Sequence, residues 1–216
     1  MNNKKKGITL VVIATLFWGV MGVTSRTLGN AGIDAMSISF LRSLIATVGF
    51  FIFLCIFNRD AFKVDLKGII ISGIYGIVTF ALSFTTFNIA VQRVPIAVAT
   101  VLMFTNPIWV TIINAIFFKE KITSKKAIII TITIIGCILI SNILGVGLKG
   151  LDVVGILIGL LTGLLFALQL VTPRFFVGKY SKDSMIIYGF IFSTIALAFV
   201  ANFSGIHNAV TTNSSP

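Results

Sequence analysis

Acidic residues and histidine are scarce in this sequence, which has six carboxylates and one histidine among 216 residues. His207 lies in a polar stretch near the C-terminus. The apolar segments therefore lack the embedded carboxylate through which many coupled pumps exchange protons, and simple proton antiport is disfavoured. All six carboxylates fall in predicted loops or at the predicted ends of apolar segments: Asp34, Asp60, Asp65, Glu120, Asp152 and Asp183.

Patterns of catalytic and metal-binding residues are missing as well. Cys55 and Cys137 lie within apolar segments without the spacing of metal ligands, so we interpret them as packing residues. Residues 145–150 spell G-x-G-x-x-G, but a dinucleotide site needs a preceding strand and an acidic residue about twenty positions later. No nucleophile or base cluster lies near the apolar segments. We therefore expect neither an enzyme nor a bound cofactor or metal.

Charged residues of either sign make up only 11% of the chain, whereas 57% of the residues are hydrophobic. A soluble domain averages about 25% charged residues, and several apolar runs here reach the roughly 20 residues that a bilayer span requires. The predicted fold class is therefore all-α, a polytopic membrane helix bundle in contact with the lipid bilayer. We predict seven membrane helices, at about residues 8–26, 36–57, 68–90, 96–118, 127–145, 153–173 and 185–203.

Lysine and arginine are concentrated in alternate loops of this predicted topology. They precede the first helix and follow the second, fourth and sixth helices. Because positive charge accumulates on the cytoplasmic side, we expect a cytoplasmic N-terminus in the cell membrane and a polar tail, residues 205–216, on the outside. The net charge of +11 does not indicate a nucleic-acid partner, since the basic residues form no patch interleaved with aromatic residues.

A weak internal repeat relates residues 13–28 to residues 161–176. Leu16 aligns with Leu164 and Arg26 with Arg174, and Trp18 falls opposite Phe166. The two copies are five predicted helices apart, so they must run in opposite directions, as in the inverted repeats of secondary transporters. We predict a first five-helix repeat over residues 1–145 and the start of a second repeat over residues 146–204.

Small and polar residues recur at helical spacing on several predicted helices. Such faces either pack closely against other helices or line a cavity. We interpret the ladder Gly155-Gly159-Gly163-Ala167 as packing. The sequence also places Asn106-Pro107 in the middle of the fourth helix, where proline predicts a break or kink of the kind that lines a pathway. The candidate substrate-cavity residues are Thr15, Trp18, Thr79, Ser83, Thr86, Asn106, Pro107, Asn114, Phe166 and Gln169.

Arg42 is the one charged residue well inside a predicted helix. A charge in this position is by default a functional candidate, because burying it in hydrocarbon is costly. It lies near the outer end of its helix, however, so its side chain could also extend to the interface or pair with Asp34. Both an anchoring role and a role in substrate binding or gating remain open.

The chain resembles the EamA family of the drug/metabolite transporter superfamily. The resemblance rests on Phe17-Trp18-Gly19, on Phe40-Leu41-Arg42 and, most strongly, on residues 90–123 with Thr105-Asn106-Pro107 and Phe118-Lys119-Glu120-Lys121. It covers about residues 8–203.

This resemblance implies ten helices in two inverted five-helix repeats. A central cavity would carry small organic metabolites or drugs by alternating access. Trp18, Pro107 and the inward face of the third helix then become the best cavity candidates, and Arg42 matches the family's arginine in the second helix.

The chain departs from the family pattern because it ends after the seventh predicted helix. We expect either a truncated carrier or a cavity completed by a homodimer or a second half. The alternative is a non-transporting remnant or a membrane-embedded interaction subunit.

Overall fold

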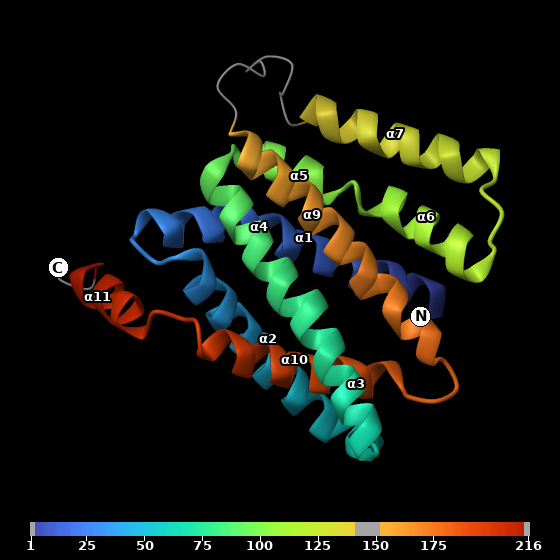
Figure 1. Cartoon of the computed structure of the whole chain (residues 1–216), viewed down its shortest axis with the longest axis horizontal. Coiled ribbons are helices and arrows are strands. Elements are labelled where there is room, and N and C mark those ends of the chain that lie inside the picture. Colours follow the sequence, from blue (N-terminus) through green and yellow to red (C-terminus); the bar gives the residue numbers. More distant parts are fainter. Residues whose placement is uncertain (1–2, 141–151, 214–216) are drawn as a thin grey trace.

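The computed structural model describes residues 3–140 and 152–213, and every regular element in that part of the chain is helical (Figure 1). The elements are α1 (Asn3–Asn30), α2 (Ala35–Phe57), η1 (Arg59–Phe62), α3 (Leu66–Gly76), the π-helical segment η2 (Ile77–Ala81), α4 (Leu82–Arg93), α5 (Ile96–Met103), α6 (Asn106–Phe118), α7 (Ser124–Ile140), α9 (Val153–Val171), η3 (Thr172–Phe176), α10 (Lys182–Ala198) and α11 (Phe203–Asn213). The predicted all-α bundle is confirmed.

In the described part of the chain, five helical segments are long and apolar enough to cross a bilayer, and α10 with α11 makes a sixth if the bent pair counts as one span. The five are Gly7–Asn30, Ala35–Phe57, Leu66–Arg93, Ile96–Phe118 and Val153–Phe176, close to the predicted first four helices and the sixth. The predicted fifth helix, residues 127–145, begins within α7 but runs past residue 140, outside the described residues.

The C-terminal part differs from the expected seventh helix and polar tail. Helix α10 ends at Ala198, and α11 follows it after a bend of 85°. Asn202 stabilises the bend through two hydrogen bonds. Its side-chain oxygen accepts the Gly205 backbone N–H at 3.0 Å, and its backbone N–H donates to the Ser37 hydroxyl of α2 at 2.9 Å. The Asn202 side chain thus caps the first turn of the helix at residues 203–213. The polar composition of this segment did not indicate a helix.

The loop carboxylates have a structural use at helix N-termini. Asp34 accepts the Ser37 N–H at 3.0 Å, Asp65 the Gly68 N–H at 3.1 Å, and Asp152 a backbone N–H of α9 at 2.9 Å. Each satisfies a donor that the first turn of a helix leaves unpaired. Half of the chain's acidic residues thus define where α2, α3 and α9 begin.

Glycines set the closest helix contacts. Gly76 at the end of α3 faces Gly189 of α10 so closely that a Cβ at Gly76 would lie 2.0 Å from the Gly189 carbonyl oxygen. On α9, a Cβ at Gly159 would meet Leu102, and one at Gly163 would lie 2.8 Å from the Leu102 carbonyl oxygen. The packing interpretation of the α9 glycine ladder is confirmed, and its partner is mainly α5.

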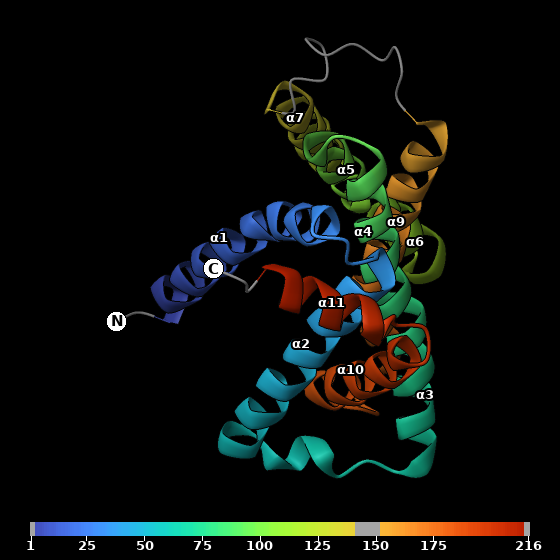
Figure 2. The same cartoon turned by 90° about the vertical axis from the view of Figure 1, so that its left-hand side faces the viewer.

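Hydroxyl groups join α2 to α10 in the bundle interior. Ser43 bonds Thr194 at 2.8 Å and Ser193 at 3.1 Å, and Thr47 bonds Thr194 at 2.8 Å. Such interhelical hydrogen bonds take the place that the hydrophobic effect has in soluble bundles. They leave the opposite side of α2 facing α1, and the two helices diverge from the turn that connects them (Figure 2).

Candidate functional site

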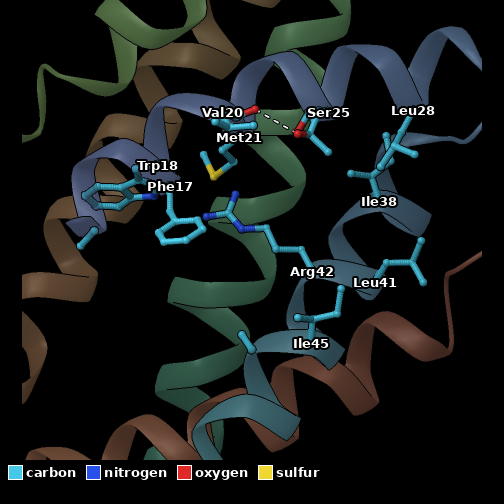
Figure 3. A pocket seen from close by; sticks show the side chains of 13 residues that line it. Phe17, Trp18, Val20, Met21, Ser25, Leu28, Ile38, Leu41, Arg42 and Ile45 are labelled. Atoms are coloured by element: carbon cyan, nitrogen blue, oxygen red, sulfur yellow. Dashed lines mark hydrogen bonds between the residues drawn. The ribbon is translucent and has the colours of Figure 1, made fainter. Parts of the chain in front are cut away.

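The diverging helices α1 and α2 border an open pocket of about 990 Å³. Its wall is almost wholly apolar, with Phe17, Trp18 and Met21 from α1 and Leu41 from α2 among its residues (Figure 3). This volume is at the upper end of the range of about 300–1,000 Å³ that is usual for small-molecule sites. The pocket is thus large enough for a small organic molecule.

Arg42 is the one charged residue among those that line the pocket. Its guanidinium extends from α2 toward Phe17 and Met21 of α1 (Figure 3) and lies 4.0 Å from the centre of the Phe84 ring of α4. The pairing with Asp34 that the sequence left open is not formed, because Asp34 caps α2. Within residues 3–140 and 152–213, no carboxylate forms an ion pair with Arg42.

Trp18 connects the pocket to α9. Its ring centre lies 5.1 Å from that of Phe166, and the two planes are tilted by 53°. Trp18 is 42% exposed, whereas Phe166 is buried. The structure therefore brings two predicted cavity residues together: Trp18 forms pocket wall, and Phe166 supports it from behind.

Of the ten predicted cavity residues, only Trp18 lines this pocket. Thr79 and Ser83 are buried on the segment from η2 to α4, and the Thr79 hydroxyl donates to the Tyr75 carbonyl at 2.8 Å. Thr15 and Thr86 likewise donate to carbonyls of their own helices, both at 2.8 Å. The polar face of the third predicted helix therefore lies in the interior of the bundle and not in the pocket. It includes part of the π-helical segment η2, and π-helical segments are often found at functional sites.

The predicted break at Asn106-Pro107 is confirmed. Helix α5 ends at Met103 and α6 begins at Asn106. Proline has no N–H for the Met103 carbonyl, and the Asn106 side-chain amide donates to that oxygen instead, at 3.2 Å. The Thr105 hydroxyl similarly donates to the Leu102 carbonyl at 2.7 Å. Two neighbouring side chains thus satisfy the carbonyls that the break exposes.

Gln169 of α9 occupies a polar position in the interior that the sequence only partly indicated. Its backbone carbonyl accepts the Tyr75 hydroxyl at 2.9 Å. Its side-chain oxygen Oε1 is buried without a hydrogen-bond donor in the described part of the chain. Tyr75 was not predicted as a site residue, and it packs against Met185 of α10 beside the Gly76–Gly189 contact.

Charged groups hold α9 at both ends. At one end Asp152 pairs with Arg93 at 2.8 Å. At the other, Arg174 of η3 pairs with Glu120 at 2.7 Å and donates to the Asn114 side chain at 2.8 Å. The structure thus places Asn114 in this charged cluster and outside the pocket.

The Arg26 guanidinium is also engaged, because it donates to the carbonyls of Val91 and Val94 at the end of α4. This link fixes the C-terminal part of α1 to the bundle. In the middle of α1, Leu16 and Phe17 are exposed.

Acidification should weaken the cluster around Glu120. Hydrogen bonds from Lys126 and Arg174 hold the pKa of Glu120 below its usual value of 4.5. The unfolded chain therefore binds more protons than the folded protein in this range, and the stabilisation present above about pH 4.5 is lost as the pH falls through the lower folded pKa. We expect the thermal unfolding midpoint of the purified protein to fall from about pH 6 to about pH 3, and to fall less in Glu120→Gln. Equal decreases in both proteins would contradict this prediction.

Over residues 5–142, the chain matches the model of the EamA-like transporter family. It is 31% identical over 149 residues to an uncharacterized transporter of Archaeoglobus fulgidus, covering 67% of this chain and 52% of that protein. It is 23% identical over 193 residues to an uncharacterized transporter of Helicobacter pylori, covering 89% of this chain and 63% of the relative.

A third relative is the pseudopaline exporter CntI of Pseudomonas aeruginosa, 24% identical over 136 residues, which cover 63% of this chain and 46% of CntI. The chain thus spans between 46% and 63% of the length of these three relatives. No solved structure matches it. Since the family match runs from α1 to α7 and includes well over half of the residues, the chain belongs to the EamA-like transporter family.

Proposed function

We propose that this protein carries a small organic solute across the cell membrane and that the α1–α2 pocket forms part of the solute's path. The observation that carries the proposal is a single guanidinium, Arg42, in a pocket of about 990 Å³ within the membrane-spanning part of the bundle. A charge at this depth is expensive unless it faces water or an ionic partner. A water-filled pocket meets that requirement, and a solute could enter it.

The arrangement of α5, α6 and α9 supports transport by alternating access. Discontinuous helices often form the substrate and ion sites of secondary transporters, and access alternates when one part of the bundle rocks against the other. Here the break between Met103 and Asn106 lies midway between the two ion-pair links that hold α9. In this proposal, residues 1–145 form one five-helix repeat, residues 146–204 begin an inverted second repeat, and the N-terminus is cytoplasmic.

Thiol accessibility tests the proposal directly. In a protein whose own Cys55 and Cys137 are replaced by serine, Ala46→Cys and Trp18→Cys place single thiols in the pocket wall. We expect both to react with a membrane-impermeant maleimide from at least one side of membrane vesicles, because a thiol forms its reactive thiolate only where water reaches it. Ala46→Cys matters most, since it barely changes the size of the side chain.

Two control variants define the scale and the sidedness. Leu170→Cys places a thiol on an exposed apolar position of α9 outside the pocket, and its labelling should be at least about tenfold slower than that of Ala46→Cys. Lys63→Cys lies in the exposed segment after α2 and should react only from the cytoplasmic side. If neither pocket thiol reacts from either side while Lys63→Cys does, the pocket is filled by lipid or protein and the proposal fails.

A further inference from the structure

We infer that the α1–α2 pocket binds an organic anion with an apolar body, whose acidic group meets Arg42 and whose apolar part lies against Phe17 and Trp18. This inference rests on the proposed function, because a soluble anion reaches the pocket only if water does. It adds the chemical class of the ligand, which the family match does not specify.

The state of the other arginines makes Arg42 distinctive. Arg26 donates to the carbonyls of Val91 and Val94, and Arg59 donates to a backbone carbonyl of α2. Arg93 pairs with a carboxylate, and Arg174 pairs with a carboxylate and an amide. In the described part of the chain, Arg42 has only the face of the Phe84 ring. A ring face attracts the positive charge, but it gives the five N–H donors of a guanidinium no lone pairs to bond.

The surroundings of Arg42 favour a ligand that brings its own negative charge. The remaining lining residues are apolar apart from Thr24 and Ser25, and none is acidic. A carboxylate placed on the guanidinium can accept two parallel hydrogen bonds, and these are stronger in low-dielectric surroundings than in water. The pocket therefore complements an anion through Arg42 and excludes organic cations for the same reason.

The aromatic side chains of the pocket wall indicate which apolar group the ligand carries. Phe17 and Trp18 both line the pocket, and their exposed fractions are 77% and 42%. Phe166 holds the Trp18 ring from behind. Aromatic rings arranged in this way bind flat apolar groups through offset or edge contacts. An aryl or similarly flat apolar body suits this wall better than a small hydrophilic anion such as phosphate.

The depth of Arg42 favours a soluble anion over a membrane lipid. Arg42 is seven residues into α2, which begins at Ala35, so it lies about 10 Å along the helix from that end. Lipid phosphates stay in the headgroup region outside the hydrocarbon core. A phospholipid would have to sink by most of that distance to place its phosphate on the guanidinium, whereas a small anion has no such constraint.

Quenching of Trp18 fluorescence tests the inference with a matched pair of probes. The chain has two tryptophans, so Trp109→Phe leaves Trp18 as the only reporter. The purified full chain in a non-ionic detergent is titrated with 4-bromobenzoate and with the neutral analogue 4-bromobenzamide, since bromine quenches tryptophan on contact. We expect saturable quenching with an apparent affinity at least about tenfold higher for the benzoate, because one charge-assisted contact contributes on this scale.

Variants of Arg42 separate binding from folding. Arg42→Gln should reduce the preference for the benzoate to less than about twofold, whereas Arg42→Lys should keep part of it because the charge remains. Arg59→Gln removes an equal charge outside the pocket and should leave the preference unchanged. Size-exclusion elution and helix content establish that each variant is folded. Equal quenching by both probes, or an unchanged preference in folded Arg42→Gln, would overturn the inference.

A lipid arm distinguishes the two possible sources of the anion. The titration is repeated in nanodiscs of phosphatidylcholine with and without phosphatidylglycerol, and we expect the same benzoate affinity in both. Competition by phosphatidylglycerol would assign Arg42 to a lipid headgroup and overturn the inference. If the thiols at residues 18 and 46 are labelled but the probes bind equally, only this inference fails. If those thiols are unreactive, the proposed function fails first.

Discussion

Gly76→Ala should destabilise the protein by about 3 kcal/mol or more, a large effect for a single added methyl group. A Cβ at this position would lie 2.0 Å from the Gly189 carbonyl oxygen and 2.3 Å from its Cα. Both are backbone atoms of α10, so no side-chain rotation can relieve the clash and the helices have to separate. That separation would also strain the nearby bond between Tyr75 and the Gln169 carbonyl. The measurement is the thermal unfolding midpoint of the purified protein in detergent.

Two further glycines provide matched controls for this prediction. A Cβ at Gly49 of α2 meets nothing within 4 Å, so Gly49→Ala should leave stability unchanged or raise it by up to about 1 kcal/mol, because alanine favours a helix. Gly189→Ala should cost less than Gly76→Ala, since its nearest neighbour, at 2.9 Å, is an atom of the Phe80 ring, which can shift. Equal midpoints for Gly76→Ala and Gly49→Ala would show that α3 and α10 do not approach as described.

Asn106→Leu should destabilise the break between α5 and α6 by about 1–3 kcal/mol, because it leaves a buried carbonyl without a donor. In the wild-type protein, the Asn106 amide supplies the hydrogen bond to the Met103 carbonyl that Pro107 cannot make. Pro107→Ala restores a backbone N–H at that position. The double variant Asn106→Leu/Pro107→Ala should therefore recover much of the lost stability, and the two changes should be strongly non-additive.

The double-mutant cycle is measured from chemical or thermal unfolding of the four proteins. Thr111→Val is a useful comparison, because the Thr111 hydroxyl bonds the Pro107 carbonyl within a regular helix and its loss should cost less. Independent, additive losses in the cycle would mean that the asparagine amide does not substitute for the missing proline donor. If the break serves as a hinge, the double variant Asn106→Leu/Pro107→Ala should also exchange solute more slowly than the wild-type protein.

The sequence predicted the features that depend on neighbouring residues. Hydropathy placed the first four apolar helices and the sixth within a few residues of their observed bounds, because the backbone must satisfy its hydrogen bonds internally in a bilayer. Proline placed the break at Asn106-Pro107, since a missing donor acts on the same helix. The glycine ladder of α9 was recognisable as a packing face because its spacing puts the glycines on one side.

The candidate site was predictable only in part. Trp18 and Arg42 were identified individually, because a large aromatic residue and a charge are conspicuous within apolar helices. Their placement in one pocket between α1 and α2 was not predicted, nor was the contact between Arg42 and Phe84. Thr79, Ser83 and Asn114 look equally suitable in the sequence, yet the structure places them in the bundle or in the Glu120 cluster.

By itself, then, the sequence determined that the chain is a helical membrane protein, where five of its helices run and where one of them breaks. The tertiary structure alone decided that Gly76 meets Gly189, that Ser43 meets Thr194 and that Arg42 faces a pocket without a carboxylate. The physical reason is that helical periodicity defines which face a residue occupies but not which helix that face meets. In a membrane, where every helix is apolar, the choice of partner depends on the fit of small residues and hydroxyl groups that lie far apart in the chain.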